Sequence, residues 1–254
     1  LHAALPISRK RRSKGWALLP VALLFGSVPA GGQQVKGEAT RAAAISPSVE
    51  DQDWTTLIRA VTTPAAGSVN VPPASDALPP ASAPGAWAAK ADLARQFYRK
   101  HPGQARTVQA RKMEAQFLLH AVFEGDHAVA KRSSDTVAAF IGDPSVPEAA
   151  RAAVAGLRGF YDALSKASNP AEQATELELM ARQLIAGFPG QPQGYESLYT
   201  VASMVDDEHG RQLASELAAM EAPPAVKQKT QALLDRLSLV GRSLAEILKS
   251  GHVE

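Results

Sequence analysis

The sequence predicts an all-α protein in which helical hairpins stack on one another, because three features recur along the chain. Apolar residues fall at helical spacing from residue 87 onward, prolines separate these stretches at similar intervals, and one segment occurs twice. Residues 94–104 read ARQFYRKHPGQ and residues 181–191 read ARQLIAGFPGQ, 87 positions apart. With 254 residues, of which 45% are hydrophobic, the chain can bury a sizeable core.

The first 30 residues have the pattern of a secretory signal peptide. A basic run at residues 9–15 precedes an apolar stretch at residues 16–26, and small residues end the segment at Ala30. The apolar stretch is shorter than the roughly 20 residues that span a bilayer, so we expect a cleaved leader and no stable membrane span. We therefore expect an exported protein of the periplasm or cell envelope. The chain begins with leucine rather than methionine, and we expect residues 1–8 to be a non-native start.

Basic residues in this leader account for the high isoelectric point, near 8.9. The whole chain has 27 basic and 25 acidic residues, and without residues 1–30 it would have 22 basic and the same 25 acidic residues. The remaining chain lacks the excess positive charge typical of nucleic-acid-binding proteins, so we expect no nucleic-acid partner. The chain has no cysteine, which excludes a thiol nucleophile, a CxxC redox pair and a thiolate metal site within it.

Residues 31–86 are expected to contain one short helix and a linker. Residues 31–47 are small and polar, and we expect them to be disordered. Ser48 can cap a helix in which apolar residues recur at helical spacing, namely Trp54, Leu57, Ile58 and Val61. Residues 62–86 are rich in proline, alanine and serine, a composition that cannot continue a helix or bury a core and is typical of an extended linker.

Residues 87–254 are predicted to form the helical-repeat domain. Asn169, Pro170 and Glu172 occupy the N-cap, first and third positions of a helix, a favourable start. That helix carries one continuous apolar stripe, made of Leu177, Met180, Ala181, Leu184, Ile185 and Phe188. Since no stretch alternates β-branched and polar residues, we expect no sheet.

Prolines punctuate this domain at intervals that resemble a repeat period. Pro102, Pro144 and Pro189 each follow a helix that ends in aromatic or aliphatic residues, and they are spaced by 42 and 45 residues. Pro223 and Pro224 add a shorter fourth step. Periods of roughly 34 to 47 residues are typical of tetratricopeptide and HEAT hairpins, which bury their apolar faces only against their neighbours. We therefore interpret the repeated PGQ as the end of a hairpin's first helix and the repeated ARQ as the solvated last part of that helix.

Few histidines or carboxylates form patterns that indicate chemistry. His101 occupies the position of Phe188 in the second copy, so we expect it to pack at a helix end rather than act as a base or ligand. His120 and His127 are seven residues apart, but Gly125 is expected to break the helix between them, which argues against a metal pair.

A dense polar cluster occurs at Asp206, Asp207, Glu208 and His209. Such carboxylates could bind a hard cation, but they lack the alternating ligand positions and the glycine of a calcium loop, so we favour a helix cap. The sequence contains no GxSxG, HExxH, GxxxxGK or GxGxxG motif. We therefore expect no catalytic residue, cofactor or metal. An enzyme whose site is assembled from dispersed residues remains the alternative.

Charge is distributed unevenly along the predicted repeats. Residues 90–114 contain two acids, Asp92 and Glu114, whereas residues 161–221 contain ten acids and three basic residues. The basic residues of the first segment are Lys90, Arg95, Arg99, Lys100, Arg106, Arg111 and Lys112. These residues are either solvated outer helix faces or a docking surface, for an anionic partner or for a second copy of the chain arranged head to tail.

Several segments together resemble the helical region that precedes a thioredoxin-like domain in exported bacterial disulfide-reductase-like proteins. They are the leader, the short tryptophan-containing helix, the proline-rich linker, ADLARQFYRKHPGQARTVQARKMEAQFLLHAVFEGD at residues 91–126 and KQKTQALLDRLSLVGRSL at residues 227–244. The resemblance implies that a first thioredoxin strand would follow residues 239–244, but SLAEILKSGHVE predicts another helix. Without cysteine, no redox residue can be assigned. We expect a non-catalytic module that positions a protein partner or a C-terminal redox domain.

Overall fold

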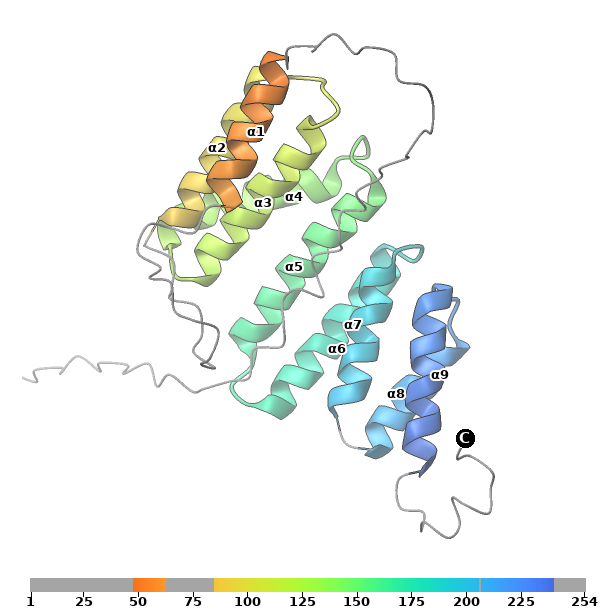
Figure 1. Cartoon of the computed structure of the whole chain (residues 1–254). Helices are drawn as coiled ribbons and strands as arrows, with labels where there is room; N and C mark the ends of the chain where they lie inside the picture. The colour runs from red at the N-terminus through yellow and green to blue at the C-terminus, as the bar shows by residue number, and fades with distance from the viewer. Residues whose placement is uncertain (1–47, 63–84, 206, 240–254) are drawn as a thin grey trace, which may run out of the picture. The chain divides into compact units, whose positions relative to one another are not determined.

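The computed structural model describes residues 48–62, 85–205 and 207–239, which form nine α-helices and no strand (Figure 1). The prediction of an all-α protein is confirmed. The leader, residues 31–47, most of the linker and the last predicted helix lie outside the described residues. The helices are α1 (Val49–Thr62), α2 (Ala86–Lys100), α3 (Thr107–Phe123), α4 (Ala130–Gly142), α5 (Glu148–Lys166), α6 (Pro170–Gly187), α7 (Pro192–Met204), α8 (Asp207–Ala219) and α9 (Pro224–Leu239), with a 3-10 turn at His127–Val129.

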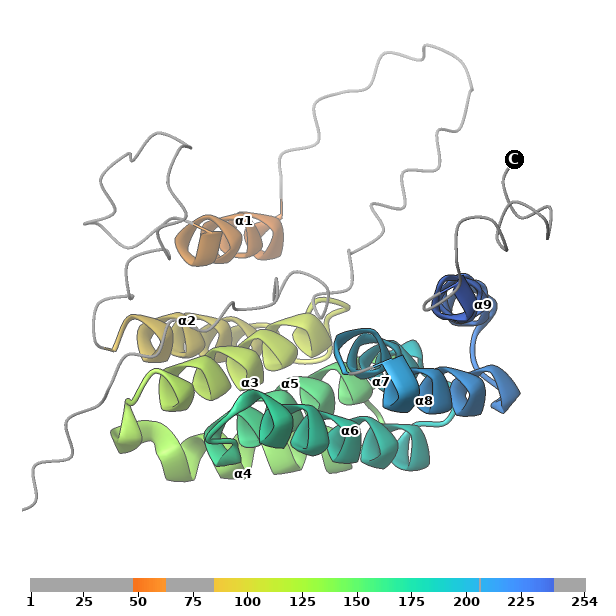
Figure 2. The ribbon, with the colours of Figure 1, turned by 90° about the horizontal axis from the view of Figure 1, so that it is seen from below.

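The helices from α2 to α9 pack as antiparallel neighbours. Each helix contacts its successor, and in addition α3 contacts α5, α5 contacts α7 and α7 contacts α9. The helix α4 therefore lies against α3 and α5, α6 lies against α5 and α7, and α8 lies against α7 and α9 (Figure 2). Contacts limited to near neighbours in sequence are characteristic of stacked hairpins, in which each unit completes the core of the next.

The prolines lie at the corners between these helices, as predicted. Pro102 separates α2 from α3, Pro144 separates α4 from α5, Pro189 separates α6 from α7, and Pro224 begins α9. Proline cannot donate the backbone hydrogen bond that a continuing helix needs, which places it between helices or in a first turn. In the first corner Gly103 adopts a φ of 77°, a conformation that other residues rarely adopt.

The two copies of the repeated segment end their helices with the same backbone hydrogen bond, but one detail of the interpretation was wrong. The amide of His101 donates to the Phe97 carbonyl at 3.0 Å, and that of Phe188 donates to the Leu184 carbonyl at 2.8 Å. Ala94 and Ala181, the first residues of the two ARQ triplets, are fully buried rather than solvated.

Helix periodicity explains the burial of these alanines. Ala94 lies three residues before Phe97, and Ala181 lies three residues before Leu184, so each alanine shares the core-facing side of its helix with that larger residue. Of each triplet only the glutamine, Gln96 or Gln183, is exposed.

The predicted start of α6 is confirmed in atomic detail. The side-chain oxygen of Asn169 accepts a hydrogen bond from the Glu172 amide at 2.9 Å, and the Glu172 carboxylate accepts one from the Ser168 amide at 2.7 Å. Pro170 occupies the first turn. This reciprocal arrangement satisfies two backbone donors that the helix itself cannot pair. Leu177, Met180, Ala181 and Leu184 of the predicted stripe are buried.

Small residues allow the helices to approach closely. A Cβ added to Gly194 of α7 would lie 2.8 Å from the backbone nitrogen of Ile185 in α6, and one added to Gly210 of α8 would lie 2.5 Å from the Ala202 carbonyl oxygen in α7.

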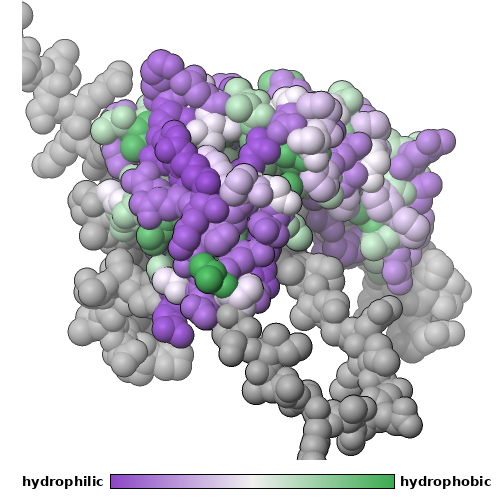
Figure 3. Space-filling view, turned by 90° about the horizontal axis from the view of Figure 1, so that it is seen from above, coloured by the Kyte–Doolittle hydropathy of each residue, from purple (hydrophilic) through white to green (hydrophobic). Residues whose placement is uncertain are grey.

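The face seen in Figure 3 is mostly hydrophilic, with hydrophobic residues in isolated spots. No helix in the described parts of the chain is long and apolar enough to cross a membrane.

Candidate functional site

Three of the seven residues in the predicted basic patch contact α1. The ammonium of Lys90 donates to the Val61 carbonyl at 2.8 Å. Lys100 forms an ion pair with Asp53 at 2.6 Å, and Arg106 forms one with Asp51 at 2.7 Å. The acidic first turns of α1 thus face the cations at the α2–α3 corner.

The other four basic residues have different surroundings from the three that contact α1. Arg111 pairs with Asp143 at 2.9 Å, and its guanidinium lies 5.8 Å from the centre of the Phe140 ring. Burial lowers the pKa of Lys112. Arg95 and Arg99 form no ion pair within the residues that the structure describes.

Arg95 and Arg99 lie on a different side of α2 from the residues that meet α1. They share that side with Asp92, at a spacing of three and seven residues, and Asp92 pairs with Arg132 of α4. The cations of α2 are therefore divided between a surface beside α1 and a surface beside α4.

Apolar contacts join the same helices beneath the ion pairs. Leu57 of α1 is 4% exposed and belongs to a cluster with Ala94, Phe97 and Ala110. The Trp54 ring meets the Phe97 ring edge to face, with centroids 5.1 Å apart. Val61, Tyr98 and Met113 are partly buried against this cluster. We call this contact of α1 with α2 and α3 the α1 seam.

His101 packs at the end of α2 as predicted, but it also makes a polar contact that the sequence did not indicate. Its ring lies 4.9 Å from the Phe97 ring, and its Nε2 lies 2.7 Å from a carboxylate oxygen of Asp53. Hydrogen bonds from Lys100 and then from His101 lower the pKa of Asp53. Asp53 lies 48 residues from His101, beyond the linker, so only the tertiary structure brings the two together.

The N-terminus of α1 is capped without help from the repeats. The hydroxyl of Ser48 accepts from the Asp51 amide at 3.1 Å and donates to the Asp51 carboxylate at 2.8 Å. Hydrogen bonds from Ser48 and then from Arg106 lower the pKa of Asp51. Asp51 therefore serves both the helix cap and the contact with the α2–α3 corner.

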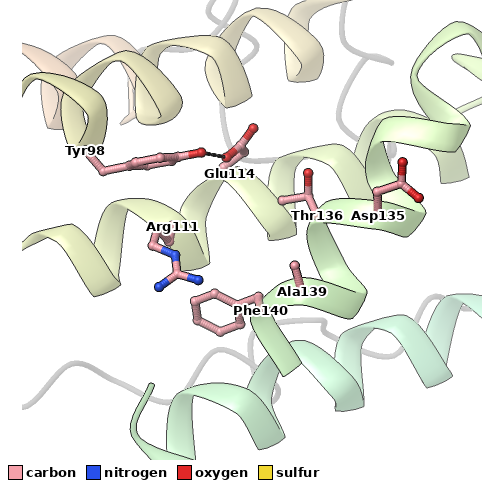
Figure 4. Close-up of a pocket in the computed structure, with 7 residues that line it drawn as sticks. All are labelled: Tyr98, Arg111, Glu114, Asp135, Thr136, Ala139 and Phe140. Atoms are coloured by element: carbon pink, nitrogen blue, oxygen red, sulfur yellow. Dashed lines mark hydrogen bonds between the residues drawn. The ribbon is translucent and has the colours of Figure 1, made fainter. Parts of the chain in front are cut away.

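A cavity of about 260 Å³ lies beside α2, α3 and α4 (Figure 4). Its lining residues are Tyr98, Arg111, Glu114, Asp135, Thr136, Ala139 and Phe140. Glu114 is 2% exposed and accepts hydrogen bonds from the Tyr98 hydroxyl at 2.7 Å and from Arg132 at 2.7 Å. Arg132 also binds Asp92 at 2.5 Å. Burial and then the hydrogen bond to Glu114 raise the pKa of Tyr98.

The ionisable groups around this cavity are thus bound to other protein groups. Arg111 pairs with Asp143, and Asp135 pairs with Lys131 at 2.6 Å. Asp92 and Glu114 are the two acids within the basic segment, and both bind Arg132 of α4. Their presence among so many cations was the one sequence signal of this network.

His120 and His127 lie in different elements, and the predicted break at Gly125 is confirmed. The helix α3 ends at Phe123, Gly125 has a φ of 100°, and His127 begins the 3-10 turn. His120 stacks on Trp87, with ring centroids 4.7 Å apart, and its Nδ1 contacts the Tyr161 hydroxyl. Burial, assisted by the nearby Lys90, lowers the pKa of His120 to about 4.

The predicted acidic cluster is only partly described, since Asp206 lies outside the described residues. Asp207 is the first residue of α8, and the Nε2 of His209 lies 3.1 Å from a carboxylate oxygen of Glu178. Arg182 binds both Glu178 and Glu216. Within the described ranges no group of three or more histidine, aspartate or glutamate side chains has an arrangement that could hold a metal ion.

No family model, no curated protein and no solved structure matches this chain.

Proposed function

We propose that this chain is a non-catalytic, exported helical-repeat module that binds a protein partner through its helix faces. The observation that supports the proposal best is the α1 seam. There the repeats hold the helix α1, which lies on the other side of the linker, through two acid–base contacts and a small apolar cluster. A stack of hairpins presents many such helix faces, and proteins of this architecture commonly use them for binding.

The resemblance described above suggests the kind of partner. In that setting the repeats would position a thioredoxin-like domain that follows them in the same chain. The sequence of the gene downstream of codon 254 tests this part directly. An in-frame strand followed by WCxxC supports it, whereas a stop codon favours a separate partner protein.

Site-specific photocrosslinking in the producing organism tests the binding function. We would place a benzophenone amino acid at Lys100, an exposed position of α2 at the edge of the α1 seam. Its counterpart in the second copy is Gly187, which is also exposed and serves as the matched control. We expect one protein to be crosslinked from residue 100 and not from residue 187. A scan of exposed positions on every described helix that yields no specific crosslink would contradict the function.

The alternative is an enzyme, and the cavity in Figure 4 is the observation that favours it, because four ionisable side chains line it. These are Tyr98, Arg111, Glu114 and Asp135. A complementation experiment with a deletion strain distinguishes the two. The enzyme is favoured if the wild-type chain complements the deletion phenotype and a folded Glu114→Gln chain does not, with partner crosslinking unchanged.

A further inference from the structure

The helix α1 is attached to the molecule by fewer buried residues than the helices of the repeats. Of its 14 residues only Leu57 is fully buried, whereas α5 buries seven of 19. Its ion pairs with Lys100 and Arg106 are formed by partly exposed side chains, which water and salt can reach. An isolated helix of this length is marginal in water, so α1 depends on this limited contact.

The connection between α1 and α2 is longer than their positions require. The hydrogen bond from Lys90 to the Val61 carbonyl places the end of α1 beside the beginning of α2. Neighbouring helices are commonly joined by roughly two to eight residues, yet 22 residues separate Thr62 from Gly85. A tether of this kind keeps its helix near the seam at an effective concentration on the order of millimolar.

The face that α1 covers is formed entirely by the repeats. Ala94 and Phe97 come from α2 and Ala110 comes from α3, and these two helices also pack directly on each other. Lys90, Lys100 and Arg106 flank this apolar strip. The strip and its cations are complementary to a helix with acids in its first turns and apolar residues at the spacing of Trp54, Leu57 and Val61.

We propose that this face of α2 and α3 is the binding site for an acidic amphipathic helix of a partner protein, and that α1 is a tethered occupant which the partner helix displaces. The inference deepens the proposed function and rests on it. A second copy of the chain is the weaker competitor. Its α1 offers the same contacts without the tether, so the chain's own α1 prevails below millimolar protein concentration.

A labelled peptide of residues 48–62 is the probe for this site, with binding to the full chain measured by fluorescence anisotropy. In the receptor variant Trp54→Ala/Leu57→Ala, α1 loses its apolar contacts with α2 and α3. The apolar residues of α2 and α3 are unchanged. We expect the peptide to bind this variant at least about tenfold more tightly than the wild-type chain, because the competing occupant has been weakened.

Reversing one ion pair shows whether recognition follows the observed contacts. Adding Lys100→Glu to the receptor variant should weaken binding of the wild-type peptide on the order of fivefold, and a peptide with Asp53→Lys should recover it. Asp53 is suited to this exchange because it does not cap the helix. Absence of peptide binding to the receptor variant, or binding that ignores both charge changes, would overturn the proposal.

Hydrogen exchange of the wild-type chain is an independent measurement. We expect the amides of α1 to exchange at least about tenfold faster than the central amides of α5, because α1 opens without unfolding the repeats. Equal protection of the two helices would show that α1 is a permanent part of the core and would refute the displacement. Dimers that form by exchange of α1 at micromolar concentration, measured by sedimentation, would also refute the displacement.

The outcomes separate this inference from the proposed function. A specific crosslinked partner without peptide binding to the receptor variant leaves the function standing and overturns the docking site on α2 and α3. Peptide binding without any crosslinked partner overturns the partner-binding function and, with it, the partner as the displacing helix.

Discussion

Glu114→Ala removes a buried carboxylate that joins three helices. Glu114 lies on α3 and accepts hydrogen bonds from Tyr98 of α2 and Arg132 of α4, and it is 2% exposed. After the substitution the Tyr98 hydroxyl and one side of the Arg132 guanidinium lose their partner. Breaking a fully buried ion pair costs about 3–5 kcal/mol of the free energy of unfolding.

The structure lowers that figure for Glu114. Arg132 is 26% exposed and keeps its contact with Asp92, so water and a second carboxylate still compensate part of its charge. We therefore expect a loss of about 2–3 kcal/mol, equivalent to roughly 5–10 °C in melting temperature for a domain of this size. Glu114→Gln should lose less, about 1–2 kcal/mol, because the amide oxygen can still accept one hydrogen bond.

Urea denaturation followed by circular dichroism measures these differences. Lys131→Ala is the matched control, because it breaks an ion pair on α4 between side chains that are 88% and 64% exposed, and we expect it to leave the stability nearly unchanged. Combining Tyr98→Phe with Glu114→Ala in a double-mutant cycle isolates the hydrogen bond between them. If Glu114→Ala is no more destabilising than Lys131→Ala, the carboxylate does not hold the three helices together.

Three further predictions follow from the helix contacts and the buried histidine. Gly210→Ala should lower the free energy of unfolding by about 1–3 kcal/mol because its Cβ would lie 2.5 Å from the Ala202 carbonyl oxygen, while Gly187→Ala, with open space around it, should be neutral or stabilising in the same denaturation assay. Asn169→Ala should lower it by about 1 kcal/mol through loss of the α6 cap; a change below 0.3 kcal/mol would mean that the cap contributes little. His120 has a folded-state pKa of about 4, below its unfolded value of 6.5, so the unfolded chain binds the extra proton first and stability should fall as the pH drops from 6.5 to 4, by up to about 3 kcal/mol. His120→Gln should remove that part of the pH dependence, and identical pH profiles for the two chains would contradict the assignment to His120.

The helices and their corners could be predicted from the sequence because their causes are local. Apolar spacing, the Asn169 cap and the prolines at 102, 144 and 189 act within a few residues of themselves. The burial of Ala94 and Ala181 was interpreted wrongly, since an alanine in a polar triplet does not indicate which side of its helix meets a neighbour. Periodicity from Phe97 and Leu184 was the signal that could have placed both alanines in the core.

The candidate binding surface was decided by the tertiary structure. The sequence grouped seven basic residues by their proximity along the chain, but folding directs Lys100 and Arg106 toward α1 and leaves Arg95 and Arg99 on another side of α2. Asp53 and Asp51, which pair with these cations, lie about 50 residues away on the other side of the linker. The length of that linker does not determine where α1 packs. These charges come within pairing distance only in the folded arrangement of α1, α2 and α3, which is why local patterns alone could not identify this surface.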